Sequence, residues 1–547
     1  MPRRRFHSPA WLPILLFAFC PLLDSLAQTV DAFNPDVRDV VWTTALQPDG
    51  AILMGGTFTN IAGFHRYHLA RLTSDGALEQ SMNIGVNREV YAIAVQEDGR
   101  VLAGGDFFNY QLTNGAVVGS CNHLARFLPE GTPDLAFKGS ANLPVTSLIV
   151  QRDQKILVGG MFSTLSGLST YLGIGRLEPN GQADTNFILN ARGLGSVQCL
   201  AIQPDGKILV GGNFTRLGGQ ACTNLGRLNV DGTLDSSFLT GFGGTVDCLA
   251  VQPDGKILLN GLPNSSLSGS FLRLNPDGTR DTNFISQAVR TGPVDPGSLQ
   301  SILLQADGSV IIGGEFDRIG DFYRTNLARL RPDGAVDPAW LLRPGNNGII
   351  YSLAPQADGR TLVAGYFGVL AGQTRNYVGR LTNPEVATNE LKISRSEVAW
   401  MLGGSSPVFW RVAVASSVDG VDWSPLGEAN VVSGGWKLSS PALSPGLSIR
   451  ARGYVLGGYR NGSSWFVEKT AVVPEWPRIV SDDARFGIDS QQFGFNVAGA
   501  SGQEFVIESS KNLVDWTPIA TNTLGAEPFY FSQPVLHEPA ARFFRLR

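Results

Sequence analysis

Three polar residues at one repeated position are the first candidates for ligand chemistry. Asp106, Asn213 and Glu315 each follow a Gly-Gly pair at the end of an apolar strand segment. Their side-chain oxygens could bind the hydroxyls of a sugar or a cation, because carboxylates and amides accept hydrogen bonds and coordinate hard ions. Solvated strand ends would explain the same residue types equally well. We therefore take these three residues as candidate ligand-binding residues.

The chain has few residues arranged for catalysis. Its histidines beyond residue 27 show no metal-binding spacing, and they are His65, His68, His123 and His537. The sequence contains no nucleophile elbow, phosphate-binding loop or dinucleotide fingerprint. We therefore predict no catalytic residues, no metal and no cofactor. One alternative stays open, in which carboxylates of different repeats meet across a channel at the separation of about 5–10 Å that glycoside hydrolysis needs.

An aspartate and an arginine recur in every copy of a sevenfold repeat. The aspartates are Asp49, Asp98, Asp153, Asp205, Asp254, Asp307 and Asp358. The arginines are Arg71, Arg126, Arg176, Arg227, Arg273, Arg329 and Arg380. They could form seven ligand sites, but a charge inside a packed repeat must be paired because its desolvation costs several kcal/mol. We therefore predict structural roles, with each arginine in an ion pair or bonded to turn carbonyls.

These residues belong to a phrase of about 50 residues, a period that is typical of β-propeller blades. The fourth copy is the clearest, with QPDGKILVGGNF, LGRL and DGTLDSSF. Short apolar segments separated by Asp-Gly turns predict four antiparallel strands per copy, and hence an all-β, seven-bladed β-propeller. A solenoid of hairpins is the alternative. The seventh copy lacks its fourth strand, and residues 29–33 resemble the missing piece. An N-terminal strand that completes the last blade would close the ring and leave no open edge.

The connections between strands divide the predicted ring into two faces. One face carries the Asp-Gly turns, and the other carries the connections from strand two to strand three and from one copy to the next. Insertions at 109–121 and 289–296 both fall on this second face. The residue after the Gly-Gly pair points the same way, and it reads Thr57, Asp106, Met161, Asn213, Leu262, Glu315 and Tyr366. Because loops on a rigid scaffold carry function, we predict that this face binds the ligand; drift in tolerant loops would give the same pattern.

The first 27 residues have the three parts of a secretory signal peptide. Arginines at positions 3–5 precede an apolar stretch, and Ser25-Leu26-Ala27 offers the small residues that cleavage requires. The apolar stretch is too short to span a bilayer. We therefore expect an exported protein, in the periplasm, at the cell surface or outside the cell, with no transmembrane segment after signal cleavage. The net charge of −4 and the lack of a basic block disfavour nucleic acid as a partner.

Four cysteines follow the predicted signal peptide: Cys121, Cys199, Cys222 and Cys248. Cys199 and Cys248 occupy one strand position at which the other copies have Thr, Ala or Ser. The position therefore selects for small size, and a buried free cysteine behaves as a small apolar residue. A disulfide between Cys199 and Cys248 stays open as an alternative, since it would require Cα atoms within about 7 Å.

Two related segments follow the repeats and a linker at 382–390. They predict β-sandwich modules at residues 391–473 and 478–547. VAVASSVDGVDWSPLG begins at Val412 and FVIESSKNLVDWTPIA at Phe505. Each places a tryptophan, Trp423 or Trp516, beside a turn, and a later strand is rich in arginine. This pattern favours an antiparallel sandwich with a buried tryptophan; a sugar-stacking role for the tryptophans is the alternative.

The repeated phrase, with LGRL and DGTLDSSF, resembles the delta-60 repeat, a β-propeller repeat of bacterial exported proteins, over residues 29–382. The fifth copy departs from it, with Asn260-Gly261 in place of Gly-Gly. The terminal modules resemble fibronectin type III domains. The resemblance implies the fold and export but assigns no activity.

We therefore predict an exported, monomeric, non-catalytic binding or scaffold protein. It comprises a signal peptide (1–27), a propeller (28–382) and two modules, and it engages a polysaccharide or a cell-surface protein. The alternative is a propeller-type carbohydrate hydrolase or lyase with carboxylates at the channel mouth.

Overall fold

The regular structure of the chain is almost entirely β. The computed structural model describes residues 27–547 except 170–172, 188–194, 239, 241–242, 263–268, 292–294, 343–347, 384, 440–442, 490 and 536–541. Within these residues the single helical element is the 3-10 turn η2 (Tyr459–Asn461), so the predicted all-β class is confirmed. No helix in the described part is both long and apolar enough to cross a membrane. The predicted signal peptide falls on residues 1–26, outside the described residues, and on Ala27.

Seven antiparallel sheets follow one another along the chain, one for each repeat, with the second strand between the first and the third. Their strands are β2 (Val41–Leu46), β3 (Ile52–Gly56) and β6 (Leu69–Leu72); β8 (Val90–Val95), β9 (Val101–Gly105) and β12 (Leu124–Phe127); β13 (Val145–Val150), β14 (Ile156–Gly160) and β17 (Ile174–Leu177); β18 (Gly195–Ile202), β19 (Ile208–Phe214) and β22 (Leu225–Leu228); β23 (Thr245–Val251), β24 (Ile257–Leu262) and β25 (Gly269–Leu274); β28 (Ser298–Leu304), β29 (Val310–Glu315) and β32 (Leu327–Leu330); and β34 (Gly348–Pro355), β35 (Thr361–Phe367) and β38 (Val378–Thr382).

The turn between the first and second strands explains the repeated aspartate. In the fourth repeat the Lys207 amide donates to Asp205 Oδ1 at 3.1 Å, and Gly206 follows the aspartate with φ +85°. An aspartate bonded to the amide two residues on is a common turn-forming arrangement, and glycine accepts positive φ without strain. All seven aspartates bond in this way to the amide two residues later. Their contacts are therefore local and structural.

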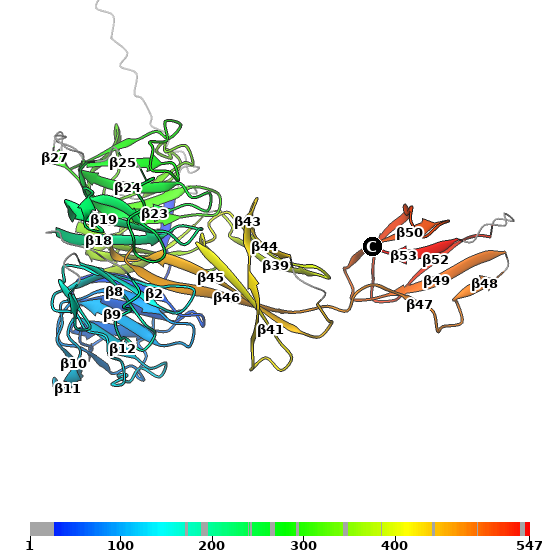
Figure 1. Ribbon diagram of the computed structural model, residues 1–547, viewed down its shortest axis with the longest axis horizontal. Helices are drawn as coiled ribbons and strands as arrows, with labels where there is room; N and C mark the ends of the chain where they lie inside the picture. Colours follow the sequence, from blue (N-terminus) through cyan, green and yellow to red (C-terminus); the bar gives the residue numbers. More distant parts are fainter. Residues whose placement is uncertain are drawn as a thin grey trace, which may run out of the picture.

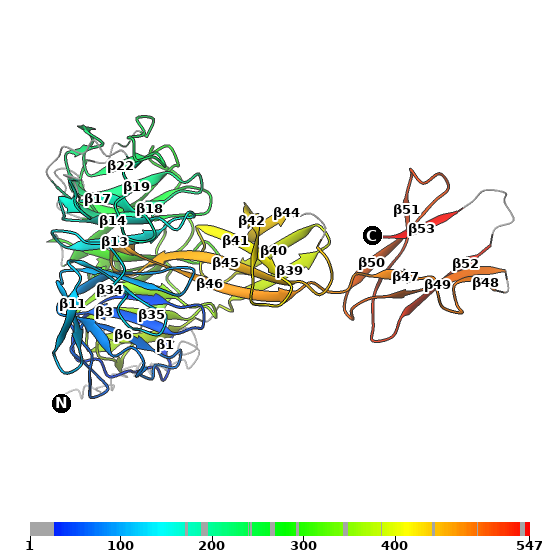
Figure 2. The same cartoon turned by 60° about the horizontal axis from the view of Figure 1, so that its bottom comes forward.

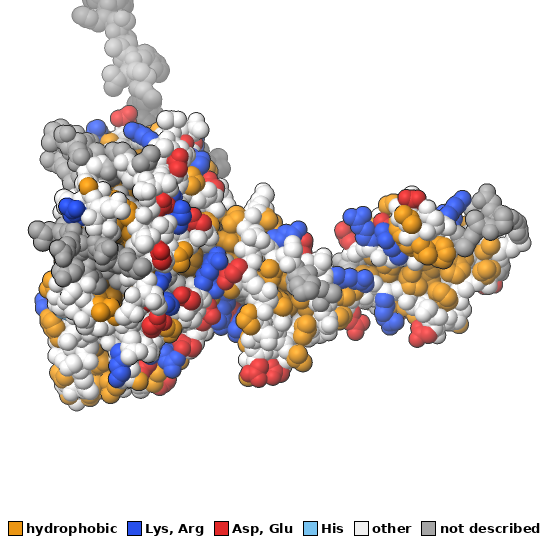
Figure 3. Space-filling model, in the orientation of Figure 1, with side chains coloured by type: hydrophobic (Ala, Val, Ile, Leu, Met, Phe, Trp, Pro, Cys, Tyr) orange, Lys and Arg blue, Asp and Glu red, His pale blue; other side chains and the backbone are white. Residues whose placement is uncertain are grey.

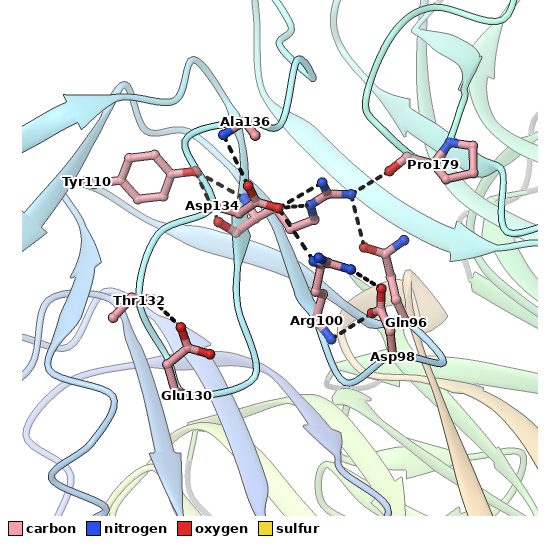
Figure 4. Close-up of polar contacts among 10 residues, drawn as sticks. Gln96, Asp98, Arg100, Tyr110, Glu130, Thr132, Asp134, Ala136 and Pro179 are labelled. Carbon is pink, nitrogen blue, oxygen red and sulfur yellow. Dashed lines mark hydrogen bonds and ion pairs between the residues drawn. The ribbon is translucent and has the colours of Figure 1, made fainter. Parts of the chain in front are cut away.

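The repeated arginine does not pair with this aspartate. In the first six repeats its partner is the carboxylate eight residues further on, as in Arg126 with Asp134 and Arg227 with Asp235, both at 2.8 Å. In six repeats a second guanidinium nitrogen donates to a turn carbonyl of the neighbouring repeat. Figure 4 shows Asp134, Gln96 and Pro179 around one such group. In five repeats a phenylalanine ring also lies 4.5–4.8 Å from the guanidinium carbon. The arginine therefore ties neighbouring repeats together.

The predicted fourth strand is mostly absent as a regular strand. In the fourth repeat, pairing beyond the second turn is reduced to an isolated bridge between Leu228 and Leu234, and five other repeats have an equivalent bridge. The residues that follow instead place Asp235 and Phe238 against Arg227. This segment is therefore held by charge and cation–π contacts more than by a backbone ladder, which strand propensity alone does not reveal.

The N-terminal segment supplies these contacts for the seventh repeat. Strand β1 (Ala27–Val30) pairs antiparallel with β38, with Val30 opposite Leu381, and pairs parallel with β33 (Leu341–Leu342). Asp31 accepts from Arg380 Nε at 2.6 Å, and Phe33 lies 4.8 Å from that guanidinium. Arg380 also donates to the Ser74 carbonyl of the first repeat at 2.6 Å.

The first strand of each repeat packs against the first strand of the next, and β34 also packs against β2. We call the space that these strands border the channel. We call the side with the Asp-Gly turns the turn face and the opposite side the loop face. Short hairpins line the loop face: β4 (Asn60–Ile61) with β5 (Phe64–His65), β15 (Thr164–Leu165) with β16 (Leu168–Ser169), β20 (Arg216–Leu217) with β21 (Gln220–Ala221), β30 (Arg318–Ile319) with β31 (Phe322–Tyr323), and β36 (Val369–Leu370) with β37 (Gln373–Thr374).

The two predicted insertions form ordered strands. The first is a hairpin of β10 (Asn109–Leu112) and β11 (Val117–Ser120) that adds to β7 (Ile84–Val86). The second contains β26 (Gln287–Thr291), which pairs with β25, β27 (Asp295–Pro296) and β30. Figure 1 shows β10, β11 and β27 at the side of the propeller farthest from the C-terminal half.

Two sheets form the module after the propeller. One contains β39 (Thr388–Ser394), β40 (Glu397–Gly403), β44 (Gly435–Ser439) and β43 (Asn430–Val432). The other contains β42 (Ser424–Glu428), β41 (Arg411–Ser417), β45 (Ser448–Gly457) and β46 (Ser463–Val472). Its first strand begins at Thr388, inside the predicted linker. Strands β45 and β46 extend beyond the module into the propeller (Figures 1 and 2); with η2 they make a hairpin that we call the channel hairpin.

A second, thinner module ends the chain, and it lies farthest from the propeller (Figure 2). It contains β47 (Arg478–Val480), β48 (Gly487–Asp489), β49 (Gln492–Ala498) and β52 (Phe529–Pro534) in one sheet, and β50 (Glu504–Ser510), β51 (Thr517–Thr523) and β53 (Phe543–Leu546) in the other. The predicted buried tryptophans are not in the cores. Trp423 and Trp516 are half-buried, and Arg450 and Arg545 each lie 4.2 Å from one of the rings.

The four cysteines of the described residues, Cys121, Cys199, Cys222 and Cys248, are free thiols. Cys199 and Cys248 are fully buried, and their Sγ atoms face the carbonyls of Val246 and Leu299 in the following repeats. Burial raises the pKa of both thiols. The small residue at this strand position therefore fits the packing between repeats, and the disulfide alternative is not realised.

Candidate binding surface

The channel hairpin fills the centre of the propeller with hydrogen-bonding groups. Asn461 Nδ2 donates to the Ile302 carbonyl at 2.8 Å, and its Oδ1 accepts from the Ile302 amide at 3.0 Å. Ser463 Oγ accepts from the Ile93 amide at 2.9 Å and lies 2.8 Å from Thr43 Oγ1. The inner edges of propeller strands otherwise present unpaired backbone groups. The hairpin therefore bonds to several repeats at once.

Small residues allow this close fit. A Cβ atom on Gly458 would come within 2.4 Å of Thr43 Oγ1, and one on Gly462 within 2.4 Å of the Thr146 carbonyl oxygen. Gly458 also has φ +76°, a conformation that favours glycine. The glycines on both sides of Tyr459–Asn461 are thus required by packing and by backbone conformation.

The hairpin enters from the turn face. Strand β46 pairs parallel with β8 through Ser464 and Ala94, and β8 runs toward its Asp-Gly turn, so the hairpin leaves the channel on that side. The module then rests on the turns: the Asp307 amide donates to the Gly404 carbonyl at 3.1 Å, and Glu97 accepts from the Tyr454 hydroxyl. Figure 3 shows charged side chains gathered where the propeller meets this module. Much of the turn face is therefore covered, whereas the loop face lies opposite the module.

Seven residues form a ring where the first strands begin at the loop face, and we call them the channel ring. Each lies in the first strand of its repeat and has no partner residue in the second strand, because the pairing register shifts across it as at a β-bulge. They are Trp42, Tyr91, Thr146, Gln198, Asp247, Gln300 and Tyr351. Repeats seven, one and two contribute aromatic side chains and the other four contribute polar ones. The sevenfold symmetry is therefore broken into an aromatic half and a polar half.

The tip of the channel hairpin contacts both the aromatic and the polar half of the channel ring. The Tyr459 ring centroid lies 5.2 Å from that of Trp42, 6.2 Å from Tyr91 and 5.8 Å from Tyr351. On the polar side, Arg460 Nε donates to Gln300 Oε1 at 3.5 Å. The mouth of the channel is thus filled by packed aromatic and polar side chains.

Burial controls the ionisable groups of the ring. It raises the pKa of Tyr91 and Tyr351 to about 12, so both remain neutral phenols near neutral pH. Burial also raises the pKa of Asp247, and the positive charge of Arg460 opposes this shift only in part. Within the described residues, Trp42 Nε1 and Gln198 Oε1 are buried without a hydrogen-bond partner.

The three predicted ligand residues lie around the loop face and not in one cluster, since they belong to the second, fourth and sixth repeats. Asp106 is half-buried and pairs with Arg88 Nη2 at 2.9 Å. Asn213 and Glu315 are exposed, opposite Ser196 and Ser298 in their sheets. No three His, Cys, Asp or Glu side chains in the described ranges are grouped as metal ligands would be. Asn213 and Glu315 are therefore each accessible to a ligand on this face, whereas Asp106 is already ion-paired with Arg88.

An open cleft of about 180 Å³ lies on the loop face of the seventh repeat. Its lining is Gly348, Tyr366, Phe367, Gly368, Asn376 and Tyr377. Tyr366 is 54% exposed, and its ring centroid lies 6.2 Å from that of Tyr377. Tyr366 follows Ala364-Gly365 at the same repeat position where Asp106, Asn213 and Glu315 follow a Gly-Gly pair.

Sequence reasoning missed the channel ring and the cleft. The signal for the ring was the variable residue just before the small Thr, Ala, Ser or Cys position of each first strand. The signal for the cleft was the aromatic Tyr366 at a position where the other repeats have smaller or polar residues. The channel hairpin had no comparable periodic signal.

The comparison with known families identifies the repeats. Seven segments match the model of a β-propeller domain of unknown function, DUF5122, at residues 47–81, 96–137, 151–187, 203–238, 252–284, 305–339 and 356–383. The chain thus contains seven repeats of this β-propeller type. No curated protein matches the chain.

Similar solved structures are distant. The WD40 β-propeller domain of Doa1 is 16% identical, with 65% of this chain and 95% of that chain covered and a TM-score of 0.34. Hydrazine synthase of Kuenenia stuttgartiensis is 11% identical, with 81% and 68% covered and a TM-score of 0.25. A glycoside hydrolase is 11% identical, with 84% and 97% covered and a TM-score of 0.23. We draw no conclusion about function from these three structural similarities.

Proposed function

We propose that this chain is an exported, non-catalytic binding or scaffold protein that engages a polysaccharide or a cell-surface protein with its loop face. One observation carries the proposal: the channel hairpin fills the channel and its module covers the turns, so the loop face remains for a partner. The one-sided insertions at β10–β11 and β26–β27 support the same face. Binding on exposed loops of a rigid scaffold is a common use of such folds.

The carbohydrate hydrolase or lyase alternative is not favoured. It would need carboxylates brought together at the channel mouth, whereas the mouth is packed with Trp42, Tyr91, Tyr351 and Tyr459. Asp106 pairs with Arg88, and Asp247 faces the charge of Arg460. We therefore keep binding as the proposed role.

Further parts of the proposal concern architecture and location. We propose that the propeller is a seven-bladed ring of delta-60 type, closed through β1, because Arg380 bonds to both Asp31 and Ser74. The two C-terminal modules would be fibronectin-III-like spacers or attachment modules on a monomeric protein. Export rests on the N-terminal signal pattern, and N-terminal sequencing of the protein recovered outside the cytoplasm should begin at Gln28.

The binding test uses the mature chain 28–547, because the propeller is bonded to the channel hairpin. The chain is screened against arrayed polysaccharides and surface-protein extracts. In one variant, residues 108–122 are replaced by the shorter connection 215–223. In a second, Val117→Lys and Val118→Lys charge the exposed β11 strand. Arg152→Glu, on the exposed turn face, is the control. Weaker binding by the β10–β11 variants alone supports the proposal; loss only with Arg152→Glu contradicts it.

A further inference from the structure

We propose that the cleft on the seventh repeat binds one uncharged pyranose unit of a polysaccharide, which stacks on Tyr366 and Tyr377 and bonds to Asn376. The inference rests on the proposed function of the loop face and specifies its ligand. It draws on the cleft's shape, on the presence of a bulky residue with positive φ at Tyr377 and on the charge of the lining.

The cleft has the size and polarity of a single sugar ring. Its volume of about 180 Å³ is below the roughly 300–1,000 Å³ of pockets that hold drug-sized ligands. Tyr366 presents an exposed aromatic ring, and the Asn376 side chain is exposed with no hydrogen bond to it elsewhere in the described chain. Aromatic faces pack against the apolar faces of sugar rings, while an amide both donates to and accepts from hydroxyls.

Tyr377 is a bulky side chain at a repeat position where four other repeats have His or Asn. It has φ +65° just before the third strand, and the equivalent residues His68, His123, Asn224 and Asn326 also have positive φ. Asparagine tolerates this conformation and bonds locally: Asn224 and Asn326 each accept from the amide of a nearby phenylalanine. A bulky residue with positive φ is uncommon. Backbone strain of this kind points toward function when the surrounding structure maintains it, and here the tyrosine forms one wall of the cleft.

The lining favours an uncharged ligand. The six residues that line the cleft include no Asp, Glu, Lys, Arg or His. Arg375 is adjacent in sequence but directs its guanidinium to the Thr374 and Asp31 carbonyls. Binding of an anionic polysaccharide would need basic side chains at the site. A neutral chain such as xylan, β-glucan or mannan therefore suits the cleft better than a uronate polymer or a charged peptide.

The test measures binding of the full mature chain to xylan, mixed-linkage β-glucan, mannan and dextran, with polygalacturonate as the anionic comparison. Three variants alter the cleft: Tyr366→Ala, Asn376→Ala and Tyr377→Asn. The last restores the residue type of the fourth and sixth repeats, so its melting temperature should stay equal or rise. Met161→Ala is the matched control, because Met161 is 51% exposed at the equivalent position of the third repeat.

We expect at least one neutral polysaccharide to bind, with little change between low and high salt. Tyr366→Ala and Tyr377→Asn should lower the affinity about tenfold or more, and Met161→Ala should change it less than twofold. Equal binding by wild type, Tyr366→Ala and Tyr377→Asn would overturn the inference. Binding only to polygalacturonate or to a protein would also overturn the inference. If that binding is weakened by Val117→Lys and Val118→Lys, the proposed function of the loop face still stands. Binding sensitive only to Arg152→Glu would refute both.

Discussion

Asn461→Gly should weaken the connection between the C-terminal module and the propeller. The Asn461 side chain is 2% exposed and takes part in three hydrogen bonds, two with the Ile302 backbone and one with the Ser301 hydroxyl. Asn461 also has φ +54°, which glycine adopts without strain. The substitution therefore removes the hydrogen bonds while leaving the backbone conformation accessible.

The expected loss follows from the two Ile302 backbone groups that would be left buried and unpaired. Each such group costs about 1–3 kcal/mol, so the free energy of unfolding should fall by about 2–6 kcal/mol. The propeller and first module together unfold with an entropy of roughly 1 kcal/mol/K, at about 2 cal/mol/K per residue. The melting temperature of their shared transition should therefore drop by about 2–6 °C.

Differential scanning calorimetry of the mature chain measures this shift. Asn461→Ala should lower the melting temperature by a further degree or so, since alanine is strained by about 1–2 kcal/mol at positive φ. Asn430→Ala, at an exposed position of the same module, should shift it by less than about 1 °C. The reasoning is refuted if Asn461→Gly matches wild type, or if the wild-type propeller and first module melt in two separate transitions.

Three further outcomes are expected. A Thr43→Cys, Ser463→Cys double variant should form a disulfide, seen as a cross-linked peptide by mass spectrometry, because the two hydroxyls lie 2.8 Å apart; two free thiols would contradict the hairpin position. Burial raises the pKa of Asp184 and Asp281, but hydrogen bonds from lysine and arginine outweigh it and hold both below 3.8. Their contribution to stability should thus be complete above about pH 5 and fade as the pH falls through the lowered pKa; urea midpoints that stay constant from pH 5 to pH 2 would contradict this. Cys199 and Cys248 should resist iodoacetamide until the protein is unfolded, because burial raises their pKa; rapid native labelling would contradict their packing.

The repeat could be predicted from the sequence because its determinants are local. Apolar alternation, Asp-Gly turns and the phrase itself predicted the first three strands of each repeat, and residues 29–33 predicted contacts that β1, Asp31 and Phe33 make with the seventh repeat. The partner of the repeated arginine could not be chosen, because two carboxylates per repeat were equally plausible. The reduced fourth strand was missed because side-chain contacts replace its ladder.

The candidate surface was predicted only in part. Loop lengths distinguished the face with the short turns from the face with the variable connections. They did not indicate which face the C-terminal module covers. That depends on contacts between residues about 400 positions apart, such as Thr43 with Ser463, which have no period. The tip glycines of the channel hairpin indicate only that small residues are needed there, not that a channel surrounds them. Asp106, Asn213 and Glu315 remain candidates, and Tyr366 at the same repeated position now joins them.

Hydrogen–deuterium exchange of the mature chain, with and without the polysaccharide that binds most strongly, tests the central claim that ligands occupy the loop face. The account predicts slower exchange on binding in residues 365–378 and 109–120. It also predicts no change at the turns 203–207 and 252–256 on the opposite face. Protection confined to those turns or to the C-terminal modules, with 365–378 unaffected, would contradict the account.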